Sequence, residues 1–101
     1  MADEVPLPEL FSGTFDDTTL DAWVADLTAL ASIDQVLLKG SERAHSAPGA
    51  SVAAAVACLR RGASRGVQVW YRLGEEAWCD TLVRMGDTTR IVRMRVAPEL
   101  Q

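Results

Sequence analysis

The sequence predicts a small α+β domain with two helices packed on one face of a mostly antiparallel sheet, which ends in a three-stranded meander. Its 101 residues match the common size of one domain, and a hydrophobic share of 49% is sufficient for a core. Apolar residues recur at helical spacing in two segments before residue 62, whereas the later chain reads as three strands separated by turns that contain Gly. The expected element order is α-β-α-β-β-β, in a domain at 11–97 between a tail or arm at 1–10 and a tail at 98–101.

The first helix is expected at about 18–31, after a short strand at 11–15 that Gly13 disfavours. Thr18 and Asp21 have the spacing of a capping box, with Asp in place of Glu. One face of the helix would carry the apolar residues Leu20, Trp23, Val24, Leu27, Leu30 and Ala31. Residues 33–38 then read as a strand.

A polar loop at 39–50 and an Ala-rich helix at 51–61 follow. If that helix forms a right-handed crossover, strands 33–38 and 67–73 are parallel, and the loop joins the carboxyl end of a strand to a helix N-terminus. Such a position favours anions, and the candidate donors are Lys39, Arg43, His45, Ser46 and Ser51. The loop contains neither of the common glycine-rich phosphate-binding motifs, so a plain connection also explains it.

The remaining strands are expected at 67–73, 77–85 and 90–96, joined by turns at 74–76 and 86–89. A four-residue second loop pairs Val83 with Val92, and a three-residue first loop places Val67 and Tyr71 on the same face as Val83. The opposite face would then hold the candidate partner-binding residues Trp70, Arg72, Trp78, Leu82, Arg84, Arg93 and Arg95. A slip of one residue in the first hairpin would exchange the faces of its strand.

Three interpretations of this Trp- and Arg-rich face remain open. It could be internal, buried by the first helix or the N-terminal arm, with its arginines at the rim. It could be an interface with a protein partner or a homodimer, because Trp and Arg are enriched at such interfaces. It could bind single-stranded nucleic acid through base stacking and phosphate contacts, although a pI of about 4.8 disfavours this.

The charge distribution and the scarcity of catalytic or metal-binding residue types limit the classes of function that the sequence fits. Residues 1–38 carry eight acids and no Lys or Arg, whereas residues 39–101 carry ten bases and six acids. His45 is the single histidine, and Cys58 and Cys79 fall on predicted core faces, so we expect no catalytic residues, metal site or cofactor. We find no signal peptide, and the longest apolar run is too short to span a membrane. The sequence therefore favours a non-catalytic cytoplasmic accessory subunit, adaptor or assembly factor; the alternatives are single-stranded nucleic-acid binding, or a small-anion-binding enzyme or sensor that uses the 39–50 loop.

Overall fold

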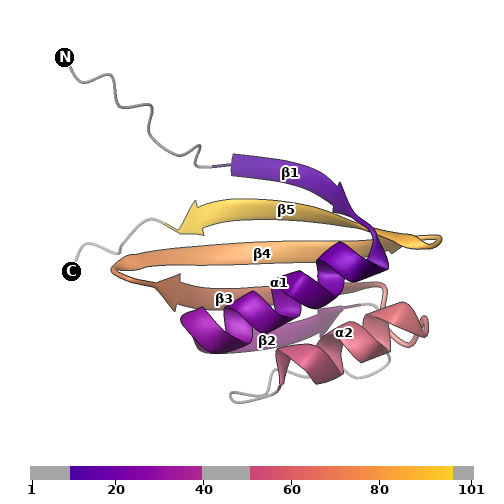
Figure 1. The fold of residues 1–101 in the computed structure, drawn as a ribbon, viewed down its shortest axis with the longest axis horizontal. Coiled ribbons are helices and arrows are strands. Elements are labelled where there is room, and N and C mark those ends of the chain that lie inside the picture. Colours follow the sequence, from indigo (N-terminus) through magenta and orange to yellow (C-terminus); the bar gives the residue numbers. More distant parts are fainter. Residues whose placement is uncertain (1–9, 40–50, 97–101) are drawn as a thin grey trace.

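A computed structural model describes residues 10–39 and 51–96 and shows an α+β fold. Its elements, in chain order, are β1 (Leu10–Phe15), α1 (Asp17–Leu30), β2 (Ser32–Lys39), α2 (Val52–Arg60), β3 (Gly66–Leu73), β4 (Glu76–Met85) and β5 (Thr88–Val96) (Figure 1). The predicted order is therefore confirmed, with one strand added at the start.

The sheet has five strands in the order β1-β5-β4-β3-β2, and every neighbouring pair is antiparallel. The residues that we expected to be a doubtful strand, because of Gly13, form β1 at the edge of the sheet, where Gly13 lies opposite Ile91. The right-handed crossover that would make β2 and β3 parallel does not form. The chain returns through α2 to the end of the sheet at which β2 finishes, and Gly66 lies opposite Lys39 in an antiparallel pair. The backbone oxygen of Lys39 accepts a hydrogen bond from the amide of Arg65 at 2.9 Å, which fixes this return.

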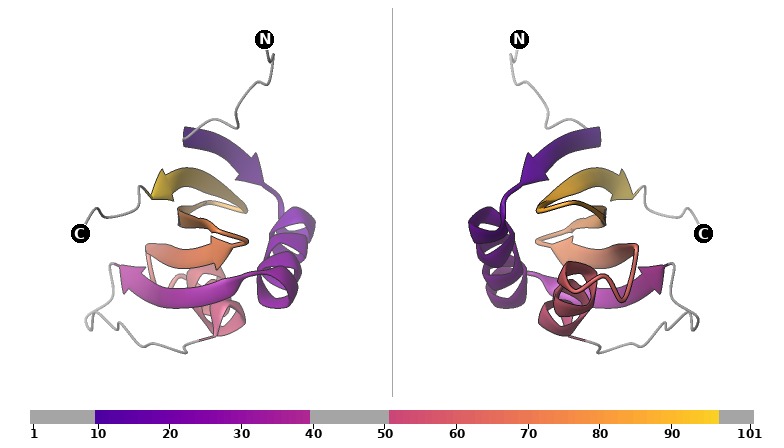
Figure 2. Two further views of the ribbon diagram at one scale, coloured as in Figure 1. Left: turned by 90° about the vertical axis from the view of Figure 1, so that its left-hand side faces the viewer. Right: turned by 90° about the vertical axis from the view of Figure 1, so that its right-hand side faces the viewer.

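Both helices cover the same face of the sheet (Figures 1 and 2). Asp16 caps α1 by accepting a hydrogen bond from the Thr19 amide at 2.8 Å, so the predicted cap was placed two residues too late. Ser51 caps α2 in the same way, through the Ala54 amide at 3.1 Å. The core between helices and sheet contains Leu20, Trp23, Leu27, Val36, Val52, Ala55, Val56, Leu59, Val67, Val69, Tyr71, Trp78, Leu82 and Ile91.

The two hairpin turns are shorter than the sequence predicted. Each loop has two residues, Gly74-Glu75 and Gly86-Asp87, and each Gly has a positive φ (65° and 68°) followed by a residue without one. This is the φ pattern of a type II′ turn, which suits the right-handed twist of paired strands. The turns therefore set the register of all three strands of the meander.

The second loop is two residues shorter than predicted and the first loop is one residue shorter. Only a change by an odd number of residues moves the side chains of a strand to the other face of the sheet. Shortening the second loop by two residues moves the partner of Val83 from Val92 to Arg90 and leaves every side chain on its predicted face. Shortening the first loop by one residue pairs Tyr71 with Trp78 and moves β3 to the other face relative to β4. The predicted register of the first hairpin was therefore wrong.

The acidic and basic parts of the chain neutralise each other across the fold. Arg60 of α2 pairs with Asp21 at 2.7 Å, and Arg84 of β4 pairs with Asp17 at 2.9 Å, both at the start of α1. At the far edge of the sheet, Arg72 pairs with Asp34 at 3.2 Å. The uneven charge along the sequence thus supplies contacts between elements.

Candidate functional site

The seven residues predicted to share one partner-binding face lie on two faces. Trp78 and Leu82 belong to the helix-covered face and are 7% and 0% exposed. Arg84, Arg93 and Arg95 lie on the same face, where they pair with Asp17, Asp80 and Glu76. These five residues therefore lie on the side of the sheet that faces the helices. Trp70 and Arg72 lie on the opposite side.

The opposite side of the sheet is covered by neither helix, and we call it the open face (Figure 2). Its apolar positions across β2 to β5 are Leu37, Trp70, Ala77, Cys79, Val83, Met85, Val92, Met94 and Val96. Val83, Met85 and Met94 are 40%, 53% and 50% exposed. Polar side chains, including Gln68 and Thr81, lie between these positions. An antiparallel sheet with one solvated face usually presents mainly polar side chains there, so the number of exposed apolar side chains is unusual.

On the covered face, a fully buried carboxylate lies between α1 and the sheet. Asp80 is 0% exposed and accepts hydrogen bonds from the Trp23 indole nitrogen at 3.0 Å and from the Tyr71 hydroxyl at 3.0 Å. Arg93 completes the cluster with two parallel bonds, Nε to Oδ1 at 3.0 Å and Nη2 to Oδ2 at 2.9 Å. Every donor is an aromatic or guanidinium group, so the carboxylate is both neutralised and fully hydrogen-bonded.

The protonation states of this cluster follow from the same contacts. Burial, followed by the negative charge of Asp80, raises the pKa of the Tyr71 hydroxyl well above its ordinary value. The hydrogen bonds from Arg93 to Asp80 raise the pKa of the guanidinium in turn. Tyr71 is therefore a neutral donor and Arg93 a fixed cation at physiological pH.

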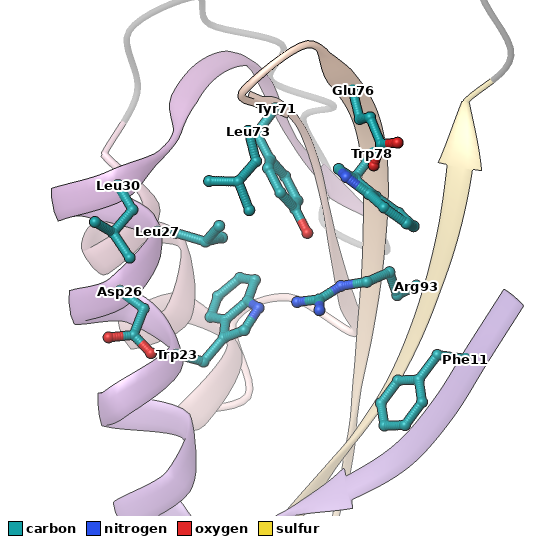
Figure 3. A pocket seen from close by; sticks show the side chains of 10 residues that line it. All are labelled: Phe11, Trp23, Asp26, Leu27, Leu30, Tyr71, Leu73, Glu76, Trp78 and Arg93. Carbon is teal, nitrogen blue, oxygen red and sulfur yellow. The ribbon is translucent and has the colours of Figure 1, made fainter. Parts of the chain in front are cut away.

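A cavity of about 470 Å³ opens beside this cluster, between the C-terminal half of α1 and strands β1, β3, β4 and β5 (Figure 3). Most of its lining is apolar: Phe11, Trp23, Leu27, Leu30, Tyr71, Leu73 and Trp78. The charged residues in the lining are Asp26, Glu76 and Arg93. Arg93 reaches from β5 toward Trp23 and forms part of the cavity wall.

The predicted anion site is described only at its two ends. Lys39 ends β2, and the Ser51 hydroxyl is occupied as the cap of α2. Arg43, His45 and Ser46 lie outside the described residues. Within 10–39 and 51–96, no three His, Cys, Asp or Glu side chains form a cluster that could hold a metal ion. In the same residues, no helix has the length and apolar character needed to span a membrane.

The cavity and the Asp80 cluster are the features that sequence reasoning missed. The available signal was Asp80 within an apolar strand. The four-residue loop predicted at 86–89, which pairs Val83 with Val92, also places Arg95 opposite Asp80, whereas the partner of Asp80 in the structure is Arg93. Charged residues are rarely fully buried, so nothing in the strand pattern itself indicated an internal pair.

Comparisons of the chain with protein-family models, curated proteins and solved structures found no match.

Proposed function

We propose that this chain is a non-catalytic interaction module that associates with a second copy of itself through the open face of its sheet. The observation that carries the proposal is the row of apolar side chains on that face, with Val83, Met85 and Met94 each at least 40% exposed. A face-to-face pair of sheets would bury these side chains in the manner of a β-sandwich core. The two free cysteines, Cys58 and Cys79, fit a cytoplasmic location for such a module.

The size of the open face supports a complete interface. Five strands of six to ten residues, about 20–33 Å long and about 4.8 Å apart, give a surface of roughly 600–700 Å² per copy. Standard protein–protein interfaces bury about 800 Å² per partner. The face is thus large enough to form a stable dimer without any further element.

The chemistry of the face supports a second copy as the occupant. Its described charged positions, Lys39, Arg72 and Arg90, lie toward the ends of their strands, and Arg72 is neutralised by Asp34. Near its centre, Gln68 donates a hydrogen bond to the Thr81 hydroxyl at 3.0 Å, so this polar pair is satisfied within the face. Apolar side chains around a satisfied polar pair, with charges at the margin, suit an interface between identical subunits. Nucleic-acid binding has less support, because Trp70 is the one aromatic residue among the described positions of this face, whereas sheets that bind RNA stack two or three bases.

The test is the oligomeric state of the full chain and of charge-insertion variants. We expect a dimer by analytical ultracentrifugation and a monomer for Met94→Glu, because this variant places a carboxylate among the apolar residues Cys79, Val92 and Val96 of the same face. Met94 replaces Trp78 and Leu82 as the target, since both of the latter belong to the core. Met94→Glu should keep the far-UV circular dichroism of the folded chain.

Ala29→Glu is the matched control, because Ala29 is exposed on α1 and therefore lies on the other side of the sheet. It introduces the same charge and should remain a dimer. A monomeric wild-type chain, or equal dissociation by Ala29→Glu, would contradict self-association. If a monomeric chain bound a single-stranded oligonucleotide with an affinity that fell steeply with salt, the open face would instead be a nucleic-acid surface.

A further inference from the structure

The cavity on the covered face has walls that are fixed before anything enters it. Trp23 and Tyr71 are each held by a hydrogen bond to Asp80, and Arg93 is held by two. A buried ion pair of this kind adds little net stability compared with apolar residues of the same volume, so stability alone does not explain it. Its structural effect is to hold two aromatic rings and one guanidinium around an open space (Figure 3).

Most of the hydrogen-bond donors around the cavity are already bonded to Asp80. The indole nitrogen of Trp23 and the hydroxyl of Tyr71 are occupied by Asp80, as are Nε and Nη2 of Arg93. The second terminal nitrogen of Arg93, Nη1, takes part in none of these bonds. The Arg93 side chain as a whole is 35% exposed and lines the cavity. A molecule inside the cavity would therefore find one donor group ready to bind an oxygen.

The charges around the cavity select against a charged occupant. Asp80 already offsets the charge of Arg93, and Arg95 pairs with Glu76 at 3.2 Å. Asp26 is the remaining charged group of the lining and is exposed on α1. A carboxylate would be desolvated near Asp80 and Asp26. An ammonium group would be desolvated beside the guanidinium of Arg93, and the attraction of Asp26 would offset little of this cost, because that carboxylate is exposed and screened by water. Neither sign of charge is favoured.

We propose that this cavity binds an uncharged, largely apolar small molecule whose body packs between Trp23, Leu27 and Trp78 and whose carbonyl-type oxygen accepts a hydrogen bond from Arg93. Its volume of about 470 Å³ lies within the usual range of small-molecule sites, roughly 300–1,000 Å³. The combination of apolar walls with a few fixed polar groups is also typical of such sites. The site is on the covered face, so it does not depend on the self-association proposed for the open face.

The experiment compares three probes with the same ring and different end groups: naphthylacetamide, naphthylacetate and naphthylethylammonium. Titration calorimetry on the full chain should give saturable binding of the amide, with an affinity roughly tenfold above those of the two charged probes. Asp26→Asn should improve binding of the acetate several-fold and leave the amide unchanged. In a Trp70→Phe background, the remaining tryptophans Trp23 and Trp78 both line the cavity, so their fluorescence should change with the same midpoint.

Leu73→Trp adds bulk at the rim of the cavity and should weaken amide binding at least tenfold, whereas Ala29→Trp, on the outer side of α1, should not affect it. Leu73 is 45% exposed, so the larger ring can be placed without disturbing the core. Absence of saturable amide binding, tighter binding of either charged probe, or equal loss in Ala29→Trp would overturn the proposal. Binding that appeared only after deletion of residues 1–9 would also overturn it, and would identify the chain's own N-terminal segment as the occupant. Met94→Glu separates this proposal from self-association, because it should abolish the dimer and retain amide binding.

Discussion

The carboxylate of Asp80 shows how one buried charge can organise several elements. It connects α1, through Trp23, to β3 and β5, through Tyr71 and Arg93, and it does so from the middle of β4. Removing one partner of such a cluster is more damaging than its net contribution to stability suggests, because the other groups stay buried without a partner. The cluster is therefore best tested by removing its donors in turn.

Tyr71→Phe deletes one hydrogen bond to a charged group and should lower the free energy of unfolding by about 1.5–3 kcal/mol. Arg93→Met leaves Asp80 without its counter-charge and should lower it by about 3–5 kcal/mol. Because both residues contact the same carboxylate, the double variant should lose clearly less than the sum of the two, as measured by urea denaturation. Strict additivity would show that the two donors act independently.

At the scale of elements, the two hairpin turns decide which side chains face the helices. Gly74 and Gly86 both have a positive φ, and no atom lies within 4 Å of the position that a Cβ would take at either residue. Substitution there is therefore strained by backbone conformation alone and not by steric overlap. The conformational effect can be measured without a packing contribution.

Gly86→Ala should lower the free energy of unfolding by about 1–3 kcal/mol, because a positive φ is unfavourable for a residue with a Cβ. Gly86→Asn should lose less than Gly86→Ala, because Asn tolerates this conformation better. The same order should hold at Gly74 in chemical denaturation. If Ala and Asn were equally tolerated at both positions, the turns would not require a positive φ.

The sequence predicted the elements more reliably than their register, and the reason lies in β4. Alternation normally distinguishes the buried face of a strand, but β4 carries Trp78 and Leu82 on one face and Cys79 and Val83 on the other. With apolar residues on both faces, a loop of two residues and a loop of three residues at 74–76 fit the pattern equally well. The same ambiguity hid the Asp80 cluster, because the predicted register places Tyr71 and Asp80 on opposite faces of the sheet. The cavity was hidden for another reason, since it depends on packing between residues far apart in the chain.

At the scale of the whole molecule, the proposed ligand site and the proposed dimer interface lie on opposite faces of one sheet. The covered face holds the core, the buried ion pair and the cavity, whereas the open face holds apolar side chains that neither of the two described helices covers. On the covered side, charge pairs join α1 to α2 through Arg60 and to β4 through Arg84. A ligand and a second copy could therefore be bound at the same time, on opposite sides of one sheet.

The dependence of global stability on the Asp80 cluster can be followed by phenolate absorbance. Tyr71 is the only tyrosine of the chain, so any phenolate signal comes from this hydroxyl. Its pKa is raised in the folded state by burial and then by Asp80, whereas in the unfolded chain it has the ordinary value of 10.0. Above about pH 10 the unfolded chain therefore releases this proton while the folded chain keeps it, so the free energy of unfolding falls as pH rises. Below that pH the stabilising contribution is fully present.

We accordingly expect the phenolate absorbance to appear together with the loss of far-UV circular dichroism in an alkaline titration, and not before it. Since the Tyr71 hydroxyl lies between α1 and the sheet, it can ionise only when these layers separate. Tyr71→Phe is the control: it should show no phenolate signal and a shallower decrease of stability with pH in this range. Phenolate absorbance that rose near pH 10 in a chain with intact circular dichroism would place the hydroxyl in contact with solvent and would contradict the buried cluster.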